Sequence, residues 1–191
     1  MLEFKNVSVE FDGVYAIDNF SLKLNRGDKV ALMGISGSGK TSLLRLAQSL
    51  VPLAKGEVVA NAKSAIMFQE PRLLPWKNAI KNITAVLPKD KQGLADKYLL
   101  AVGLSESSAK LPHELSGGMA QRVAFARFLA YAEATNAELL LLDEPFSAQD
   151  TETSEKMLEL LKEFSKEKTL LFVTHDEHEA DFLGARKIFI Q

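Results

Sequence analysis

The chain has 191 residues, of which 47% are hydrophobic and 25% charged, a composition that predicts one folded domain. Its net charge is -2, and the basic residues are scattered, which disfavours a nucleic-acid-binding protein. The absence of cysteine excludes disulfides, thiolate zinc sites and thiol nucleophiles. The longest stretch without a charged residue, 30–39, is too short to cross a bilayer. The N-terminus alternates like a strand and lacks the pattern of a signal peptide, so we expect a cytosolic protein.

The first 70 residues predict strands on either side of a glycine-rich loop. Alternating apolar residues over 2–11 and 17–24 flank Asp12-Gly13, which indicates two antiparallel strands joined by a turn. A short apolar strand at 29–33 then runs into the loop. A helix is predicted from Thr41, with Leu43, Leu44, Ala47 and Leu50 on one face and an end before Pro52, and a further strand at 64–68. We therefore expect a βαβ-like unit here.

The middle of the chain, from Pro71 to about Ala134, predicts helices, for example over 94–102. Strand character returns at 138–142, an amphipathic helix is predicted over 151–165, and another apolar strand follows at 169–173. Alternating strands and helices predict a parallel sheet. The fold expected from these patterns is an α/β core with an N-terminal antiparallel β region and an inserted helical segment.

Residues 34–41 read Gly-Ile-Ser-Gly-Ser-Gly-Lys-Thr, which fits the phosphate-loop pattern. Glycines let backbone amides close around phosphate oxygens, the lysine reaches the β and γ phosphates, and the threonine hydroxyl binds Mg²⁺. The following helix directs its positive N-terminal end at the phosphates. The alternative is a plain glycine-rich turn, but the position between a strand and a helix favours a nucleotide site.

A second acidic element follows the apolar strand that ends near Leu142. Asp143 and Glu144 lie at its carboxyl end, where open α/β sheets bind their ligands. Asp143 can hold Mg²⁺ through water, and Glu144 can polarise an attacking water. Taken alone, two acids after a strand are equally consistent with a solvated strand end; together with the phosphate loop they indicate nucleotide hydrolysis.

The stretch from Leu115 to Arg122 reads Leu-Ser-Gly-Gly-Met-Ala-Gln-Arg. Ser116 can cap the helix predicted over 119–131, and Gly117 and Gly118 expose the amides of its first turn to an anion. An ordinary capped helix is the alternative reading. The stretch resembles the signature motif of ATP-binding-cassette (ABC) ATPases, and the rest of the chain matches that family's order of motifs.

The resemblance covers essentially the whole chain and assigns three further motifs. Gln69 resembles the family's Q-loop glutamine, Ser147-Ala148-Gln149-Asp150 resembles its D-loop, and His175 resembles its switch histidine. The resemblance implies one domain over 1–191: a P-loop NTPase (RecA-like) core at about 1–69 and 136–191, and a helical subdomain at about 70–135. The chain departs from the family at Met119, at Gln149, and in the short segment between Thr41 and Gln69.

The resemblance also implies the site residues. Catalytic roles fall to Glu144 as general base, His175, Gln69 and Lys40, and Mg²⁺ would be held by Thr41, Gln69 and Asp143. The adenine would stack on Phe11, with Tyr15 as the alternative ring. The residues expected to contact ATP are Phe11, Gly34, Ser36, Gly37, Ser38, Gly39, Lys40, Thr41, Ser42 and, from the signature motif, Ser116, Gly117 and Gly118.

By resemblance the protein is an ATP-hydrolysing transporter subunit that works as a homodimer or heterodimer on the cytoplasmic face of the membrane. Met119 and the residues 69–76 resemble nitrate, sulfonate and taurine-type importer ATPases, which act with a separate permease and a solute-binding protein. We expect the permease to dock near Gln69–Ile83, where Leu73, Leu74 and Trp76 form an apolar patch rimmed by Arg72, Lys77, Asn78 and Asn82; the alternative is that this patch packs the helices onto the core. A non-transport ABC ATPase and a P-loop small-molecule kinase remain as rival functions.

Overall fold

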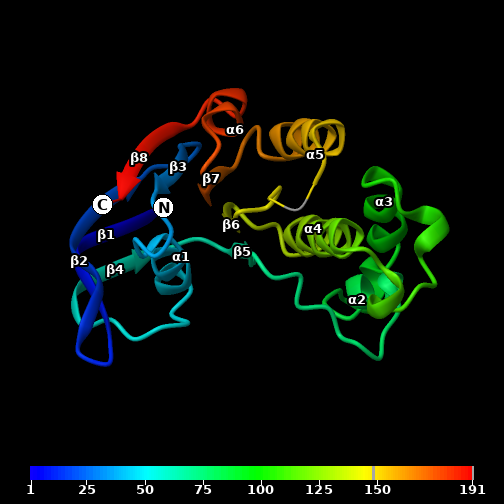
Figure 1. Ribbon diagram of the computed structural model, residues 1–191, viewed down its shortest axis with the longest axis horizontal. Helices are drawn as coiled ribbons and strands as arrows, with labels where there is room; N and C mark the ends of the chain where they lie inside the picture. The colour runs from blue at the N-terminus through cyan, green and yellow to red at the C-terminus, as the bar shows by residue number, and fades with distance from the viewer. Residues whose placement is uncertain (148, 191) are drawn as a thin grey trace.

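The computed structural model describes residues 1–147 and 149–190, and its strands and helices are shown in Figure 1. Three short 3-10 turns, at Lys89–Lys91, Ser105–Ser107 and Pro112–Glu114, lie between the longer elements. In chain order, the longer elements are β1 (Leu2–Phe11), β2 (Val14–Leu24), β3 (Lys29–Gly34), α1 (Lys40–Ala47), β4 (Lys55–Ala60), β5 (Ser64–Met67), α2 (Ala79–Thr84), α3 (Leu94–Ala101), α4 (Gly117–Ala134), β6 (Leu139–Asp143), α5 (Thr151–Phe164), β7 (Thr169–Val173), α6 (Glu177–Phe182) and β8 (Arg186–Ile190).

A parallel sheet in the order β5-β6-β7-β3-β8 forms the centre of the fold. β6 and β7 are buried along their whole length, as expected for parallel strands covered on both faces. The strand, loop, helix and strand of the predicted βαβ-like unit are present as β3, α1 and β5. β5 belongs to the same sheet as β3 but is separated from it by β6 and β7, because β3 pairs with β7 and β8.

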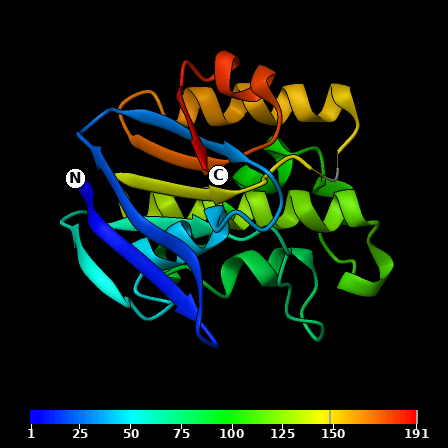
Figure 2. The same ribbon diagram turned by 60° about the vertical axis from the view of Figure 1, so that its left-hand side comes forward.

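A separate antiparallel sheet in the order β2-β1-β4 confirms the N-terminal β region. Leu2 pairs with Leu24 and Phe4 with Leu22 across the first two strands. β4, which the sequence analysis did not predict, adds to the other edge of β1; its residues are exposed or half-buried, so it lacks a clear apolar alternation. In Figure 2 the β1–β2 hairpin lies in front of the parallel sheet.

Two apolar clusters cover the two faces of the parallel sheet. Alternate residues of β6, such as Leu140 and Leu142, pack with the helices α2 to α6. Their neighbours Leu139 and Leu141 face the other way, into a cluster formed with α1 and the antiparallel sheet. In Figure 1, α5 and α6 lie at the top, while α2 and α3 lie at the end of the molecule remote from the antiparallel sheet. The parallel sheet therefore lies between α1 with the antiparallel sheet on one face and the helices α2 to α6 on the other.

Helix α1 ends at Ala47, one turn earlier than the sequence analysis predicted. Ser49 adopts a left-handed conformation with φ 54°, and the Leu50 amide donates to the Arg45 carbonyl at 2.9 Å, the pattern of a Schellman cap. Leu50, expected on the buried face of the helix, is instead 56% exposed. A cap can end a helix where apolar spacing alone would continue it.

The predicted helical middle of the chain is present as α2, α3 and α4. Tyr98 of α3 donates its hydroxyl hydrogen bond to Glu133 near the end of α4, and Lys97 pairs with the same carboxylate at 2.6 Å. The division of the chain at residues 70 and 135 into core and helical subdomain stays a prediction. Within 1–147 and 149–190, no helix combines the length and the apolar character needed to cross a membrane.

Candidate functional site

The phosphate-loop sequence connects the carboxyl end of β3 to the first turn of α1. The side chain of Lys40 is buried, and its ammonium group donates to the carbonyl oxygens of Gly34 and Ile35 at 3.0 and 2.6 Å and to Ser38 Oγ at 3.2 Å. A cation with three donors is thereby fixed inside the curve of the loop. The helix that begins at Lys40 adds the positive end of its dipole at the same place.

Two glycines of the loop are required by its backbone. Gly37 has φ 82° with open space around its Cα, so its need for glycine is conformational. Gly39 caps α1 at φ 86°, and a Cβ there would lie 2.3 Å from the carbonyl oxygen of Ala16 and 2.6 Å from Ile17 Cδ1. The loop can therefore pass this close to strand β2 only because Gly39 has no side chain.

A cavity of about 280 Å³ lies over this loop. Phe11 borders it, whereas Tyr15 is instead covered by Lys55, whose ammonium lies 4.9 Å from the ring centroid. Gly34 and Ser38, both expected to contact ATP, serve here as partners of Lys40. The expected site residues that border the cavity are Phe11, Ser36, Gly37, Gly39, Lys40, Thr41, Ser42, Gln69 and Glu144.

Arg45, which was not among the expected site residues, borders the same cavity. It lies four residues after Thr41 on α1, and residues at that spacing share one face of a helix. This four-residue spacing from Thr41 is the sequence feature that could have identified Arg45. The positive charge of Arg45 also acts on the Asp143 carboxyl, so the cavity holds two cations, Lys40 and Arg45.

Glu144 follows directly after β6 and has an unusual backbone. Its φ of 44° lies in the left-handed region that non-glycine residues rarely adopt, and its amide donates to the Val173 carbonyl at 3.0 Å. The carboxylate accepts a hydrogen bond from Gln69 Nε2 at 3.1 Å. The structure thus brings together two residues that are 75 positions apart in the chain.

Asp143, the last residue of β6, is almost completely buried. Burial raises the pKa of its carboxyl; a hydrogen bond with the Thr41 hydroxyl opposes that shift, and the charge of Glu144 adds to it. Its Oδ1 is buried and, among the described residues, has no hydrogen-bond partner. A buried carboxylate oxygen of this kind is a ready ligand for a cation.

His175 lies outside the phosphate-loop cavity. It borders a neighbouring cavity of about 230 Å³ together with Ser147 and Glu179. Its position just after β7 is held by Thr174, whose hydroxyl donates to Glu179 Oε2 at 2.6 Å and accepts from the Asp176 amide at 3.0 Å. Burial raises the pKa of Glu179, and the hydrogen bond from Thr174 opposes this.

The signature stretch begins helix α4, and it too lies apart from the phosphate-loop cavity. Ser116 Oγ accepts from the Met119 amide at 3.2 Å, which confirms the predicted cap. Ser116 and Gly117 are exposed, and a Cβ on Gly117 would meet open space. The carbonyl of Gly118 accepts a hydrogen bond from Gln149 Nε2 at 3.0 Å, so the residue that departs from the family's D-loop contacts the signature stretch. Ala148 of that loop lies outside the described residues.

The segment expected to receive a permease is organised differently from the prediction. Trp76 is 73% exposed, as a docking residue requires, but Leu73 packs partly against the core of the helical layer. Asn82, expected at a polar rim, is instead buried at 1% exposure. Its side chain bonds to the backbone of Leu74, Lys77 and Asn78 and therefore shapes the loop from inside.

Comparison with known proteins supplies independent information. A family model described as "ABC transporter" matches residues 17–147. The aliphatic sulfonates import ATP-binding protein SsuB 2 of Pseudomonas savastanoi pv. phaseolicola is 42% identical, over 99% of this chain and 70% of that protein. The taurine import ATP-binding protein TauB of Rhizobium johnstonii is 37% identical, over 97% of this chain and 78% of that protein.

Solved structures agree. A dimeric ATP-binding cassette in a post-hydrolysis state, bound to ADP and phosphate, superposes with a TM-score of 0.90 at 30% identity, covering 100% of this chain and 94% of that one. The agreement extends over the antiparallel sheet, the parallel sheet and the helical layer together.

Proposed function

The chain belongs to the ABC transporter family, and we propose that the cavity over its phosphate loop is where it binds and hydrolyses ATP to power import through a separate permease. The observation that carries this proposal is the shared border of that cavity. Lys40 of the phosphate loop, Gln69 and the strand-end carboxylate Glu144 all line it. Family membership makes the protein an ATPase subunit of a transporter, and the roles of individual residues are our proposal.

Binding of the triphosphate is assigned to the loop and its lysine. The buried ammonium of Lys40 is already directed into the loop, so exchanging carbonyl partners for phosphate oxygens requires only a small movement. The loop amides and the N-terminus of α1 add further donors. Phe11, exposed at 44% on the border of the cavity, offers an aromatic face for the adenine.

The residues near Lys40 fit a Mg²⁺ ion. Asp143 presents a buried carboxylate oxygen without a partner among the described residues, and the Thr41 hydroxyl lies beside it. Mg²⁺ is usually held by one or two protein groups together with phosphates and waters, and a carboxylate with a neighbouring hydroxyl supplies such groups. Thr41, Asp143 and Gln69 would hold the ion, which would neutralise charge that develops on the phosphates.

Hydrolysis is assigned to Glu144 as the base. Its carboxylate borders the cavity and accepts a hydrogen bond from Gln69, so it can take a proton from a water that attacks the γ-phosphate in line. Gln69 orients that carboxylate and the water through its amide. His175 follows β7, the strand beside β6, and would contact the γ-phosphate from the β7 side of the site. The strained backbone at Glu144 aims the carboxylate at the cavity rather than back along the strand.

The site is completed by a second subunit. Ser116 and Gly117 are exposed at a helix N-terminus but do not border the phosphate-loop cavity of their own chain. In a head-to-tail dimer, the signature stretch of one subunit closes the ATP site of the other, so that two ATP molecules lie at the interface. The related cassette that superposes over the whole chain is itself a dimer, which supports this assembly.

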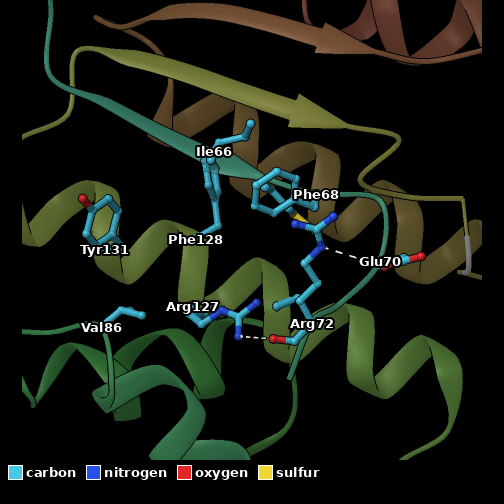
Figure 3. A pocket seen from close by; sticks show the side chains of 10 residues that line it. Ile66, Phe68, Glu70, Arg72, Val86, Arg127, Phe128 and Tyr131 are labelled. Carbon is cyan, nitrogen blue, oxygen red and sulfur yellow. Dashed lines mark hydrogen bonds and ion pairs between the residues drawn. The ribbon is translucent and has the colours of Figure 1, made fainter. Parts of the chain in front are cut away.

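The permease is proposed to dock in the groove shown in Figure 3, together with the neighbouring segment Gln69–Ile83. The groove has a volume of about 310 Å³ and is lined by apolar side chains that include Phe68, Val86 and Phe128. Exposed Trp76 lies in the adjoining segment. A short amphipathic helix suits an apolar groove of this kind. Docking here places the protein at the cytoplasmic face of the membrane.

Import is favoured by the relatives named above for sulfonate and taurine import. We propose that the solute reaches the permease from a solute-binding protein, as the importer type implied by residues 69–76 requires. On this proposal the solute itself is selected by those other chains, because the cavity over the phosphate loop is assigned to ATP.

The first experiment tests the base. Glu144→Gln keeps the shape of the side chain and removes its ability to accept a proton, so ATP should still bind while turnover falls by roughly two orders of magnitude or more. Lys40→Ala should instead weaken ATP binding itself. Turnover in Glu144→Gln within a few-fold of wild type would show that another group is the base.

The second experiment tests the composite site. In the Glu144→Gln background, ATP should convert monomers to dimers in analytical ultracentrifugation. Adding Ser116→Arg should prevent this, because the large side chain would occupy the space of the partner's γ-phosphate. A dimer that forms regardless of ATP and of Ser116 would contradict the head-to-tail arrangement.

The third experiment tests the docking segment. Trp76→Ser removes a side chain that is 73% exposed, so thermal stability and the ATPase activity of the isolated subunit should stay close to wild type while co-purification with the permease is lost. Leu73→Ser is the contrast, because Leu73 packs against the core and should lose stability. If Trp76→Ser still binds the permease normally, docking does not involve this segment.

A further inference from the structure

One arginine of helix α4 holds the backbone that follows Gln69. The two terminal nitrogens of Arg127 donate to consecutive carbonyl oxygens, Nη1 to Arg72 at 3.0 Å and Nη2 to Pro71 at 2.6 Å. Figure 3 shows the Arg127 guanidinium pointing at the backbone carbonyl of Arg72. The planar fork of an arginine fixes both the distance and the orientation of two acceptors.

Arg127 makes this contact from a partly buried position. Burial lowers the pKa of Arg127, so the protein keeps this charge partly away from water. Both acceptors are neutral carbonyls rather than carboxylates. A charge held in this way contributes only if its hydrogen bonds are well formed, so the position of residues 71–72 relative to α4 is narrowly determined.

The segment held by Arg127 is itself tightly turned. Arg72 has φ 45°, a conformation that is unfavourable for a non-glycine residue, and its guanidinium lies 4.0 Å from the centroid of the Phe68 ring. Glu70 pairs with Arg72 at 3.8 Å. Between these contacts, Gln69 extends its amide to Glu144 Oε2 at 3.1 Å. These contacts therefore hold the turn in place. From this turn, Gln69 is the side chain that reaches the Glu144 carboxylate.

We propose that Arg127 is a positioning residue for Gln69, because its two hydrogen bonds to residues 71–72 hold the turn that brings the Gln69 amide to Glu144. The inference rests on the proposed function of Glu144 and Gln69. It also links two parts of the site mechanically, since the helix that carries Arg127 begins at the signature stretch after Ser116. A displacement of α4 by the permease or by the second subunit is thereby transmitted to the Gln69 amide.

A double-mutant cycle tests the proposal, with steady-state ATPase assays of wild type, Arg127→Gln, Gln69→Ala and the double variant. Arg127→Gln should lower kcat on the order of fivefold with little change in KM for ATP, since a misplaced group costs rate rather than binding. In the Gln69→Ala background the same substitution should have almost no further effect, because the group that it positions is gone.

Two further variants control for folding. Lys91→Gln also removes a bond from a cation to a helix α4 carbonyl, that of Lys91 to Ala134 at 2.9 Å, but Ala134 is the last residue of the helix and the bond does not involve residues 69–72, so kcat should stay unchanged. Arg127→Lys keeps the charge and can reach one carbonyl at a time, so its kcat should lie between wild type and Arg127→Gln. It replaces Arg127→Gln in the cycle if that variant does not fold.

The outcomes separate the inference from the proposed function. Equal fold-losses from Arg127→Gln in the presence and absence of the Gln69 amide would overturn the positioning role, as would an unchanged kcat in Arg127→Gln. A wild-type protein without ATPase activity, or full activity in Glu144→Gln, would overturn the proposed site instead.

Discussion

Replacing Asn82 should unfold the loop that presents Trp76 and weaken the whole helical layer. The Asn82 side chain is buried, accepts from the Leu74 amide at 2.7 Å, and donates to the carbonyls of Leu74, Lys77 and Asn78 at 3.2, 2.7 and 3.1 Å. One side-chain amide thus closes the backbone of a loop that has no regular secondary structure of its own.

The hydrogen bonds of the Asn82 side chain determine how much unfolding free energy Asn82→Ala should lose. An amide NH₂ group has two hydrogens, so its three contacts amount to two bonds, one of them shared, and the accepted bond makes a third. At about 1 kcal/mol net for each bond, with an added cost for buried groups left unpaired, the loss is about 2–4 kcal/mol. For a protein of this size, that lowers Tm by roughly 6–12 °C.

The assay is equilibrium unfolding in urea followed by circular dichroism and by the fluorescence of Trp76, the chain's single tryptophan. Asn78→Ala is the matched control, because Asn78 caps α2 through one bond to the Lys81 amide at 3.0 Å, worth about 1 kcal/mol. Asn82→Asp should be at least as damaging as Asn82→Ala, since its carboxylate would face three carbonyls. A loss below that of Asn78→Ala would refute the reasoning.

Three other substitutions test the contacts of individual residues. Gln149→Leu removes the hydrogen bond to the Gly118 carbonyl at 3.0 Å and should weaken ATP-dependent dimerisation by roughly two- to tenfold in sedimentation, whereas unchanged dimerisation would make the contact incidental. Gly39→Ala places a Cβ 2.3 Å from a backbone carbonyl at φ 86°, so it should abolish ATP binding and lower stability, and wild-type binding would contradict this. Burial alone would raise the pKa of the Glu133 carboxyl. The hydrogen bonds from Lys97 and Tyr98 outweigh burial, so the pKa is lowered. A lowered folded-state pKa stabilises the protein above the unfolded-state value and loses that contribution as pH falls through the folded-state value. Glu133→Gln should therefore be less stable than wild type at pH 7, with the difference shrinking in acid unfolding curves as pH falls below about 4.3, the ordinary value of a glutamate, toward the lowered folded-state pKa, and a difference independent of pH would exclude the ion pair as its cause.

Features that depend on residues close together in the chain could be predicted from their order alone. The phosphate loop, the acidic strand end at Asp143 and Glu144, and the Ser116 cap are short contiguous patterns, and the alternation over 2–11 or the apolar run at 139–142 is a local period. The strands, the position of the loop between β3 and α1 and the Ser116 cap are confirmed, since each local pattern has few stable conformations.

Contacts between residues far apart in the chain could not be predicted in this way. That β3 lies beside β7 and β8 rather than β5, or that Asn82 is buried, depends on packing between segments far apart in the chain. The contacts of Gln69 with Glu144 and of Arg127 with residues 71–72 join positions more than fifty residues apart. Pairing free energies of this kind depend on the whole fold, because a hydrogen bond between such groups is favourable only once the surrounding layers have excluded water and fixed both partners.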